Sequence, residues 1–261
     1  MARAAVVQDF EPLPEADRLD GVPHPRFTAK LYGHLDAEAA LATGLVSGKL
    51  HHGWLMSGPA GIGKATLAWR FARAALSAAD ERDRTGRSLA VSSQTSGSRQ
   101  VRALSHPGLL LLRRPYNAKD KRFAASITID EVRRLRQFLS FGAEDGNWRV
   151  VIVDTADDMN ANAANALLKS LEEPPPRTVF LLLTSEPGRL LPTIRSRCRL
   201  MPLAPLSDED LRRAATDALE AEDGAGGGKP GGGKLPKDSD WPALQRLAGG
   251  SVRRALALHA G

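Results

Sequence analysis

A glycine-rich segment, Gly58-Pro-Ala-Gly61-Ile-Gly63-Lys64, has the composition and spacing of a loop that holds phosphate groups. Its glycines allow consecutive backbone N–H groups to turn toward phosphate oxygens with no Cβ in the way. Lys64 would add a positive charge, and a helix beginning there would add its positive dipole end. An apolar run precedes the loop and a helix-forming run follows it, which is the context that this motif requires. The sequence therefore predicts a nucleotide phosphate site.

The residue after Lys64 departs from the usual form of this motif. Phosphate loops of this type end in Ser or Thr, whose hydroxyl ligates Mg²⁺, whereas this sequence has Ala65. Thr66 is a candidate nucleotide-binding residue but does not simply substitute, because one helical step turns its side chain by about 100°. We therefore expect weak binding of ATP or ADP with little dependence on magnesium. The alternative, in which a water molecule replaces the hydroxyl and activity survives, stays open.

A second apolar run, Val150 to Val153, ends at Asp154 and is typical of a buried strand that delivers a carboxylate to a nucleotide-bound metal. In AAA+ hydrolases the next residue is usually Glu, which polarises the attacking water. This chain has Thr155, whose hydroxyl is a poor general base near neutral pH. Asp157 and Asp158 follow, and we expect them in a solvated turn. Together with the hydroxyl missing from the phosphate loop, this change predicts a site that does not hydrolyse ATP.

Strands and helices are expected to alternate around these motifs. The expected strands lie near 54–56, 109–112, 150–153 and 179–183, and the expected helices near 37–46, 66–76, 129–139 and 163–171. The strand runs are apolar without alternation, which is typical of a parallel sheet covered by helices on both faces. The predicted fold class is therefore α/β, an AAA+ P-loop parallel sheet with a small C-terminal helical lid domain.

The chain is expected to divide into three parts. Residues 1–25, rich in Pro, Asp and Glu, are expected to form a flexible leader, and residues 26–203 the P-loop core domain. Residues 206–261 are expected to form the helical lid, interrupted by a flexible glycine-rich loop at 224–233. Within the core, the polar stretch 77–106 is expected to be a partly disordered surface excursion.

Composition narrows the class of protein. The chain has 261 residues, of which 42% are hydrophobic and 25% charged, as in ordinary globular proteins. No apolar run approaches the roughly 18 residues of a membrane helix, and the N-terminus lacks a secretory signal, so we expect a cytoplasmic protein without membrane contact. A single cysteine, Cys198, excludes an internal disulfide and a multi-cysteine zinc site. The net charge of +6 is compatible with nucleic-acid contact but does not indicate it.

Three further motifs carry a resemblance to a known family. They are Asn165-Ala-Leu-Leu-Lys-Ser-Leu-Glu-Glu-Pro-Pro175, Thr184-Ser-Glu-Pro187 and Arg195-Ser-Arg-Cys198. In combination they are similar to the clamp-loader family of bacterial DNA polymerase III. Within it, the altered phosphate-site motifs resemble the delta-prime subunits more than the ATP-hydrolysing tau/gamma subunits. The segments Leu50-His-His-Gly-Trp-Leu55 and Ser105-His-Pro107 are also similar to delta-prime sequences.

The resemblance implies roles for three residues. Arg197 matches the arginine of the Ser-Arg-Cys motif, an arginine finger that acts in trans on ATP bound to the neighbouring subunit. A guanidinium suits this role because it spreads positive charge over the γ-phosphate oxygens. Thr184 matches the sensor 1 position, and Arg253 resembles sensor 2 on the lid. Two alternatives stay open: Arg195, Arg197 and Arg199 as one solvated basic face, and Arg253 as a simple surface arginine.

The resemblance implies a non-hydrolysing, stator-like subunit that helps load the sliding clamp onto primed DNA in an ATP-dependent way. The implied partners are the tau/gamma and delta subunits, the sliding clamp, and primed DNA in the assembled complex. Such a chain would be an accessory subunit of a DNA polymerase, probed best by co-purification with the other subunits. The alternatives are an active AAA+ ATPase motor of the tau/gamma type with an unusual metal site, and a P-loop small-molecule kinase.

The sequence departs from the family in two respects. Many members carry a four-cysteine zinc module after the phosphate-loop helix, but the segment 77–106 has no cysteine, so no zinc and no other metal is expected. Members also usually have a C-terminal helical collar domain that builds the pentamer. That collar is absent from these 261 residues, so either it lies outside this chain or the protein is naturally short.

Overall fold

The computed structural model describes residues 14–19, 22–140, 147–221 and 235–260. Its centre is a parallel sheet of five strands in the order β2-β5-β6-β1-β7. The strands are β1 (Gly53–Ser57), β2 (Leu109–Leu112), β5 (Arg149–Val153), β6 (Thr178–Thr184) and β7 (Arg199–Pro202). This arrangement confirms the predicted parallel α/β sheet. Strand β7 was not predicted, because it is only four residues long and contains Pro202, and three of its four residues are exposed at the edge of the sheet.

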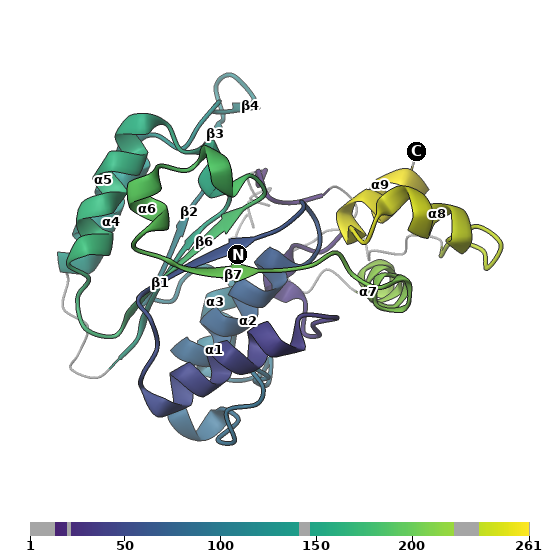
Figure 1. Ribbon diagram of the computed structural model, residues 1–261, viewed down its shortest axis with the longest axis horizontal. Coiled ribbons are helices and arrows are strands. Elements are labelled where there is room, and N and C mark those ends of the chain that lie inside the picture. The colour runs from purple at the N-terminus through teal and green to yellow at the C-terminus, as the bar shows by residue number, and fades with distance from the viewer. Residues whose placement is uncertain (1–13, 20–21, 141–146, 222–234, 261) are drawn as a thin grey trace, which may run out of the picture.

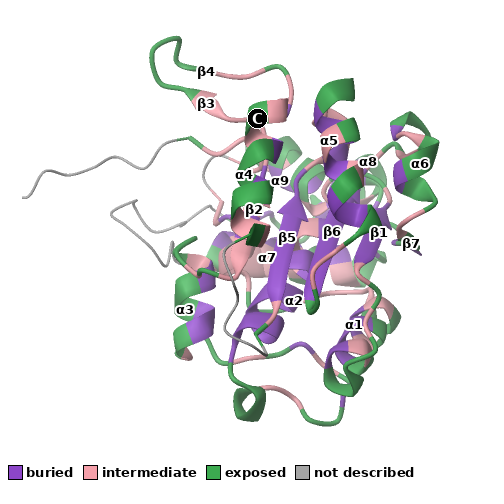
Figure 2. Cartoon of the chain, turned by 90° about the vertical axis from the view of Figure 1, so that its left-hand side faces the viewer, coloured by how far each residue is buried: buried purple, intermediate pink, exposed green. Residues whose placement is uncertain are grey.

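Helices cover both faces of the sheet (Figure 1). One face is covered by α1 (Leu35–Ser47), α2 (Lys64–Leu76) and α3 (Ser96–Arg102). The other face is covered by α4 (Ile129–Ser140), α5 (Ala161–Glu172) and α6 (Pro192–Arg195). Successive side chains of a strand point to opposite faces. In β1, Trp54 and Met56 therefore pack against α1 and α2, while Leu55 packs against α5. Figure 2 shows the resulting buried sheet between helices whose outer surfaces are exposed.

The segment 77–106 is ordered and packed, so the expectation of a partly disordered excursion was wrong. It contains α3 and a 3-10 turn at Ala79–Glu81. The side chains of Leu89 and Val101 are buried in the core beside α2. Thr95 caps α3 by accepting a hydrogen bond from the N–H of Ser98 (3.2 Å). The few apolar residues of this polar stretch are thus enough to fix it, because α2 offers them a continuous buried surface.

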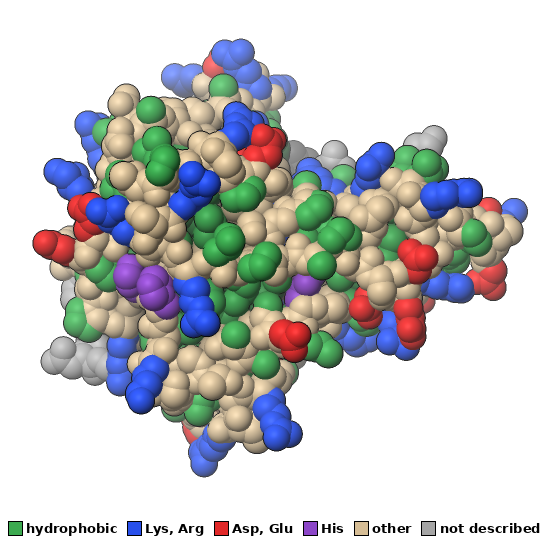
Figure 3. Space-filling model, viewed as in Figure 1, with side chains coloured by type: hydrophobic (Ala, Val, Ile, Leu, Met, Phe, Trp, Pro, Cys, Tyr) green, Lys and Arg blue, Asp and Glu red, His purple; other side chains and the backbone are tan. Residues whose placement is uncertain are grey.

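A small antiparallel hairpin, β3 (Tyr116–Asn117) and β4 (Arg122–Phe123), projects from the core after β2. Its base is closed by an edge-to-face contact between Tyr116 and Phe123, whose ring centroids lie 5.2 Å apart. The tip carries exposed Lys119 and Lys121, and Figure 3 shows basic side chains gathered there, at the top of the view. The hairpin lies away from the phosphate loop. Other 3-10 turns cover Pro25–Phe27, Ala156–Asp158 and Pro187–Arg189.

In its described residues, the C-terminal part has three helices beside the sheet (Figure 1): α7 (Asp208–Glu220), α8 (Trp241–Ala248) and α9 (Val252–Ala260). Ser207 caps α7 by accepting a hydrogen bond from the N–H of Asp210 (3.1 Å). The helices share a small apolar core of their own that includes Leu219, Trp241 and Leu256. The predicted glycine-rich loop at 224–233 lies outside the described residues. In the described part of the chain, no helix is both long and apolar enough to span a membrane.

Candidate nucleotide-binding site

The glycine-rich loop lies where the sequence predicted it, between the carboxyl end of β1 and the first residue of α2. Gly58, Gly61 and Gly63 have φ values of +149°, +78° and +111°, which favour glycine. At Gly61 a Cβ would lie 2.5 Å from the Cβ of Arg253, so glycine also lets the lid approach the loop. That approach is fixed by a hydrogen bond of 2.9 Å from the N–H of Val252 to the carbonyl oxygen of Gly61.

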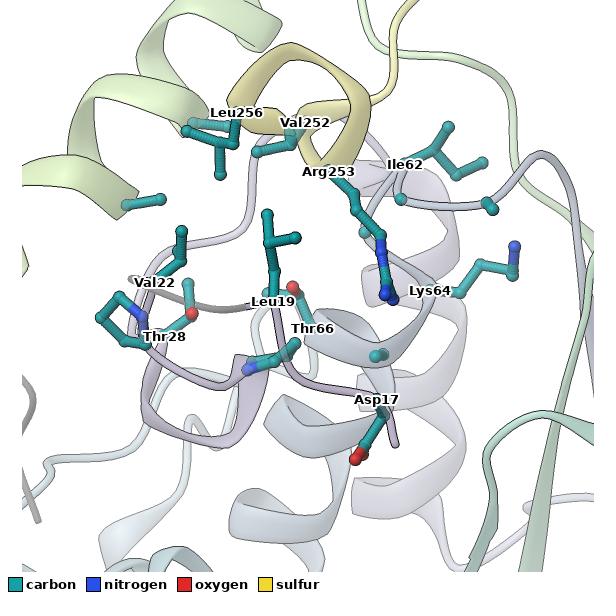
Figure 4. A pocket seen from close by; sticks show the side chains of 18 of the residues that line it. Asp17, Leu19, Val22, Thr28, Ile62, Lys64, Thr66, Val252, Arg253 and Leu256 are labelled. Carbon is teal, nitrogen blue, oxygen red and sulfur yellow. The ribbon is translucent and has the colours of Figure 1, made fainter. Parts of the chain in front are cut away.

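A cavity of about 530 Å³ lies between this loop, the first turn of α2 and the lid helices (Figure 4). Of the predicted site residues, Gly61, Gly63, Lys64, Thr66, Asp154 and Arg253 line it. Gly58 and Thr184 lie directly behind the lining, where the N–H of Gly58 donates to the carbonyl oxygen of Thr184 at 3.3 Å. The structure therefore brings together all of the predicted nucleotide-site residues at one edge of the sheet.

Lys64 is almost fully buried, and its ammonium is occupied by the chain itself. Its Nζ donates to the carbonyl oxygens of Gly58 (2.5 Å) and Pro59 (2.7 Å) and to the hydroxyl of Ser185 (3.2 Å). Figure 4 shows the ammonium turned away from the guanidinium of Arg253. Burial lowers the pKa of Lys64, against the opposing attraction of nearby carboxylates. A phosphate group would therefore have to replace hydrogen bonds that Lys64 already makes.

Asp154 directly follows β5 and is only 8% exposed. Burial, together with the negative charge of Asp17, raises its pKa to about 7, against the opposing positive charges of Lys64, Arg113 and Arg253. The side chains of Ala65 and Thr155 line the same cavity, so the two departures from an ATP-hydrolysing motif both lie at the site. Among the described residues, no cluster of three or more His, Cys, Asp or Glu could hold a metal ion.

Asp157 does not lie in a solvated turn, and that expectation was wrong. Its carboxylate accepts a short hydrogen bond from the hydroxyl of Thr184 and a bond of 2.7 Å from the N–H of Ser185. It therefore joins the 3-10 turn after β5 to the end of β6. Asp158 lines the cavity and lies 3.0 Å from Nε of Arg114. The only sequence signal was that both aspartates follow a strand that ends beside β6.

Arg253, at the start of α9, is exposed, yet its side chain points into the cavity rather than away from it. Figure 4 shows its guanidinium between Leu19 and Lys64. This placement separates Arg253 from an ordinary surface arginine, because its charge faces the region into which a phosphate would enter. It also lowers the pKa of the Asp154 carboxyl, against the larger effect of burial.

Arg197 lies outside the cavity, in the turn between α6 and β7. Its Nη2 is 2.7 Å from the carboxylate of Glu172, and its Nη1 donates to the carbonyl oxygen of Thr193 at 3.0 Å. The side chain is 35% exposed. Arg195 and Arg199 are more exposed and lie on other elements, so the three arginines are not held alike. The guanidinium of Arg197 is thus held by groups of the chain at both terminal nitrogens and is open to solvent in part.

Two acidic leader residues at the cavity were missed by sequence reasoning. Asp17 lines the cavity, and Glu15 and Asp17 both pair with Arg113, which follows β2. Of the expected flexible leader, residues 1–25, the structure packs 14–19 and 22–25 against the rest of the protein, and residues 1–13, 20 and 21 lie outside the described residues. An arginine directly after a parallel strand was the one signal that could have indicated an acidic partner at this edge of the sheet.

Comparison with known proteins identifies the family of the chain. The family model described as DNA polymerase III, delta subunit matches residues 33–207. The chain is 39% identical over 214 residues to "DNA polymerase III subunit delta'" of Pseudomonas aeruginosa, covering 79% of this chain and 58% of that protein. It is 34% identical over 209 residues to the subunit delta' of Escherichia coli, covering 77% and 59%.

More distant similarities extend along the chain. It is 30% identical to "DNA polymerase III subunit gamma/tau" of Mycobacterium bovis, covering 90% of this chain and 36% of that protein. Among solved structures, RuvB, a Holliday junction branch migration motor of Thermotoga maritima, aligns with a TM-score of 0.51 at 15% identity. That alignment covers 90% of this chain and 64% of RuvB, and it supports the AAA+ fold alone. The chain spans less than two thirds of the length of these relatives. It belongs to the delta-prime family of bacterial DNA polymerase III subunits.

Proposed function

We propose that this protein is a non-hydrolysing, stator-like subunit of the DNA polymerase III clamp loader, and that Arg197 completes the ATP site of a neighbouring subunit. The observation that carries this proposal is the contrast between the nucleotide pocket and Arg197. At the two motif positions where an ATP-hydrolysing site has a hydroxyl and a carboxylate, the pocket has Ala65 and Thr155, while Arg197 lies outside the pocket and is 35% exposed. The neighbouring subunit that would supply the ATP site is a gamma/tau subunit, a type of protein that also occurs among the relatives of this chain.

The lack of hydrolysis follows from the groups around the cavity. Mg²⁺ takes oxygen ligands, and the side chain after Lys64, that of Ala65, has none. The carboxyl of Asp154 is almost fully buried, and its burial raises its pKa. Thr155 offers no base for an attacking water. This donor set does not fit a magnesium ion held by the protein, so we propose weak binding of ATP or ADP with little dependence on magnesium and no zinc.

The position of Arg197 suits a role in trans. A finger must offer guanidinium donors to the partner's phosphate oxygens. Nη1 of Arg197 bonds to the carbonyl oxygen of Thr193, and the pair of Nη2 with Glu172 is exposed enough to exchange for a phosphate contact. A guanidinium retains its charge at any physiological pH, so the group is available without a proton transfer.

The test is Arg197→Ala in a complex reconstituted with gamma/tau and delta subunits, with phosphate release measured in the presence of clamp and primed DNA. We expect hydrolysis at the adjoining site to fall about 100-fold or more, because arginine fingers contribute at least that much. The matched control is Arg195→Ala, which removes a nearby exposed arginine on α6. An unchanged rate for Arg197→Ala, or an equal loss for both variants, would refute the finger assignment.

An active ATPase motor of the tau/gamma type is the second candidate, and the retained Lys64, Asp154 and Arg253 favour it. Magnesium-dependent phosphate release by the isolated chain, abolished by Lys64→Ala, would establish that function and exclude the first. Under the first proposal the partners are gamma/tau, delta, the sliding clamp and primed DNA, and the protein acts in the cytoplasm. Co-purification with gamma/tau and delta tests that assembly directly.

A further inference from the structure

The leader residues 14–19 and 22–25 form one wall of the nucleotide cavity. Figure 4 shows Leu19 standing in the middle of the cavity, below Val252, with Asp17 at its floor. Leu19 and Val22 pack against the apolar core of the lid, beside Leu256. Space that a nucleotide would use between the phosphate loop and the lid is thus partly filled by the chain's own apolar side chains.

Whereas Leu19 and Val22 contact the lid, ion pairs of two other leader residues, Glu15 and Asp17, hold the leader to the core. The carboxylate of Glu15 accepts from Nη1 of Arg26 at 2.6 and 2.7 Å and from Nη2 of Arg113 at 2.9 Å. Asp17 accepts from Nη1 of Arg113 at 2.7 Å. The Glu15 and Asp17 side chains are only 9% and 6% exposed. Because these charges are desolvated, separating them leaves buried charges unpaired, which is costly.

The buried side chain of His24 is a further partner of Asp17. Its ring is 0% exposed and lies edge-on to Trp69, with centroids 5.8 Å apart. Nδ1 accepts a hydrogen bond from the N–H of Arg26 (3.0 Å), so Nε2 carries the proton that is donated to Asp17 at 2.7 Å. On α2, the guanidinium of Arg73 donates to the carbonyl oxygens of Arg26 and Thr28, both at 2.7 Å. The leader is therefore anchored where it joins the core.

The charge of Asp17 disfavours a second anion in the cavity. Its carboxylate is close enough to Asp154 to raise the pKa of that group. An entering phosphate would meet this negative charge, while Arg113, the nearest cation beside it, is already paired with Glu15 and Asp17. Movement of the leader away from the cavity would remove both the negative charge and the apolar filling, and would free Arg113.

We propose that the leader residues 14–19 and 22–25 are an internal cover of the nucleotide pocket, which a nucleoside di- or triphosphate must displace from the lid and from Arg113 in order to bind. This proposal rests on the proposed function in one respect, namely that the cavity is a nucleotide site. It adds a second reason for weak binding, because affinity is reduced by the fraction of molecules in which the pocket is open.

The test uses two variants that release the leader by different means. Leu19→Ser combined with Val22→Ser removes the apolar contacts without changing charge, and Asp17→Asn weakens the ion pairs while keeping the side-chain volume. Leu247→Ser, an exposed leucine on α8, and Asp130→Asn, an exposed acid on α4, are the matched controls. The readout is titration of the 261-residue chain with a fluorescent ADP, after circular dichroism has established that each variant is folded.

We expect both leader variants to bind the fluorescent ADP about ten-fold more tightly than the unaltered chain, and the controls to match it. In the unaltered chain, saturating ADP should speed hydrogen–deuterium exchange in peptides that cover the leader. Absence of tighter binding in both leader variants, or unchanged exchange in the leader when ADP is bound, overturns the cover. Neither outcome tests the assignment of Arg197 as an arginine finger. That assignment is tested only by the partner's ATP hydrolysis.

Discussion

The nucleotide pocket and the turn that carries Arg197 belong to the same α/β core, but their charged groups differ in how they are paired and how exposed their partners are. In the pocket, the chain satisfies its own charges: Lys64 donates to backbone carbonyls, and Arg113 is paired with Glu15 and Asp17. At the turn, Arg197 has one carboxylate partner, which is 46% exposed. An internal partner in a buried site must be displaced before a ligand can bind, whereas a partner near solvent exchanges at little cost.

Under the proposed function, this difference would let one chain keep the form of a nucleotide site while Arg197 acts on the site of a neighbouring subunit. The phosphate loop remains because it also supports the fold: Gly58 approaches Leu203 so closely that a Cβ would lie 2.3 Å from its carbonyl oxygen, and Gly61 contacts the lid. The loop can therefore be required for structure even where hydrolysis is absent. The following four predictions test this contrast.

The largest expected effect concerns the geometry of the finger. Arg197→Lys keeps the charge but loses the planar fork that binds phosphate oxygens in pairs. We expect the partner's DNA-stimulated ATP hydrolysis to fall about 100-fold, nearly as far as in Arg197→Ala. Phosphate release by the reconstituted complex measures this. Retention of more than half of the rate would mean that Arg197 supplies only a diffuse positive charge.

The next effect concerns the buried carboxyl of the pocket. Because its pKa is raised to about 7, Asp154 resists ionisation in the folded state, so the unaltered protein loses stability as pH rises from about 4 to about 7. Asp154→Asn removes this loss and should increase the free energy of unfolding by on the order of 3 kcal/mol at pH 8. Urea unfolding at pH 8 and pH 4.5 measures the gain, which should nearly vanish at the lower pH. An equal difference at both pH values would contradict the prediction.

A smaller effect is expected from the leader's ion pairs. Burial opposes ionisation of Asp17, but the hydrogen bond from His24 and the charge of Arg113 lower its pKa to about 2. This stabilisation is present above about pH 4 and is lost as pH falls toward 2. We expect Arg113→Ala to cost about 2 kcal/mol at pH 7 and less at pH 3, by urea unfolding. The neighbouring Arg114→Ala, which removes a more exposed pair with Asp158, serves as the control and should cost less.

The smallest effect is expected at the partner of the finger. Glu172 and Arg197 are 46% and 35% exposed, and pairs of this kind contribute little to stability. Glu172→Gln should change the free energy of unfolding by less than about 0.5 kcal/mol and leave the partner's hydrolysis within about two-fold. Thermal unfolding and phosphate release measure the two quantities. A large loss of hydrolysis with normal stability would show that Glu172 positions Arg197 rather than merely accompanying it.

Much of the fold and part of the site could be predicted because their signals are local. The run Val150 to Val153 is apolar and ends in Asp154, and the glycine-rich loop stands between a strand and a helix, so both were placed correctly. The bond from Thr184 to Asp157 was missed, because it joins residues 27 apart that meet only once the strands are ordered in the sheet. The packing of 77–106 was missed because isolated apolar residues in a polar stretch show no periodicity.

The sequence by itself determined the parallel sheet, the phosphate loop and the two altered positions Ala65 and Thr155, since hydrophobic period and motif spacing are properties of neighbouring residues. Only the tertiary structure decided what those groups contact. It directs Lys64 toward carbonyl oxygens, joins Asp17 to Arg113 across 96 residues, and leaves Arg197 partly exposed. The physical reason is that burial and charge pairing depend on which distant segments meet, and no local pattern encodes that meeting.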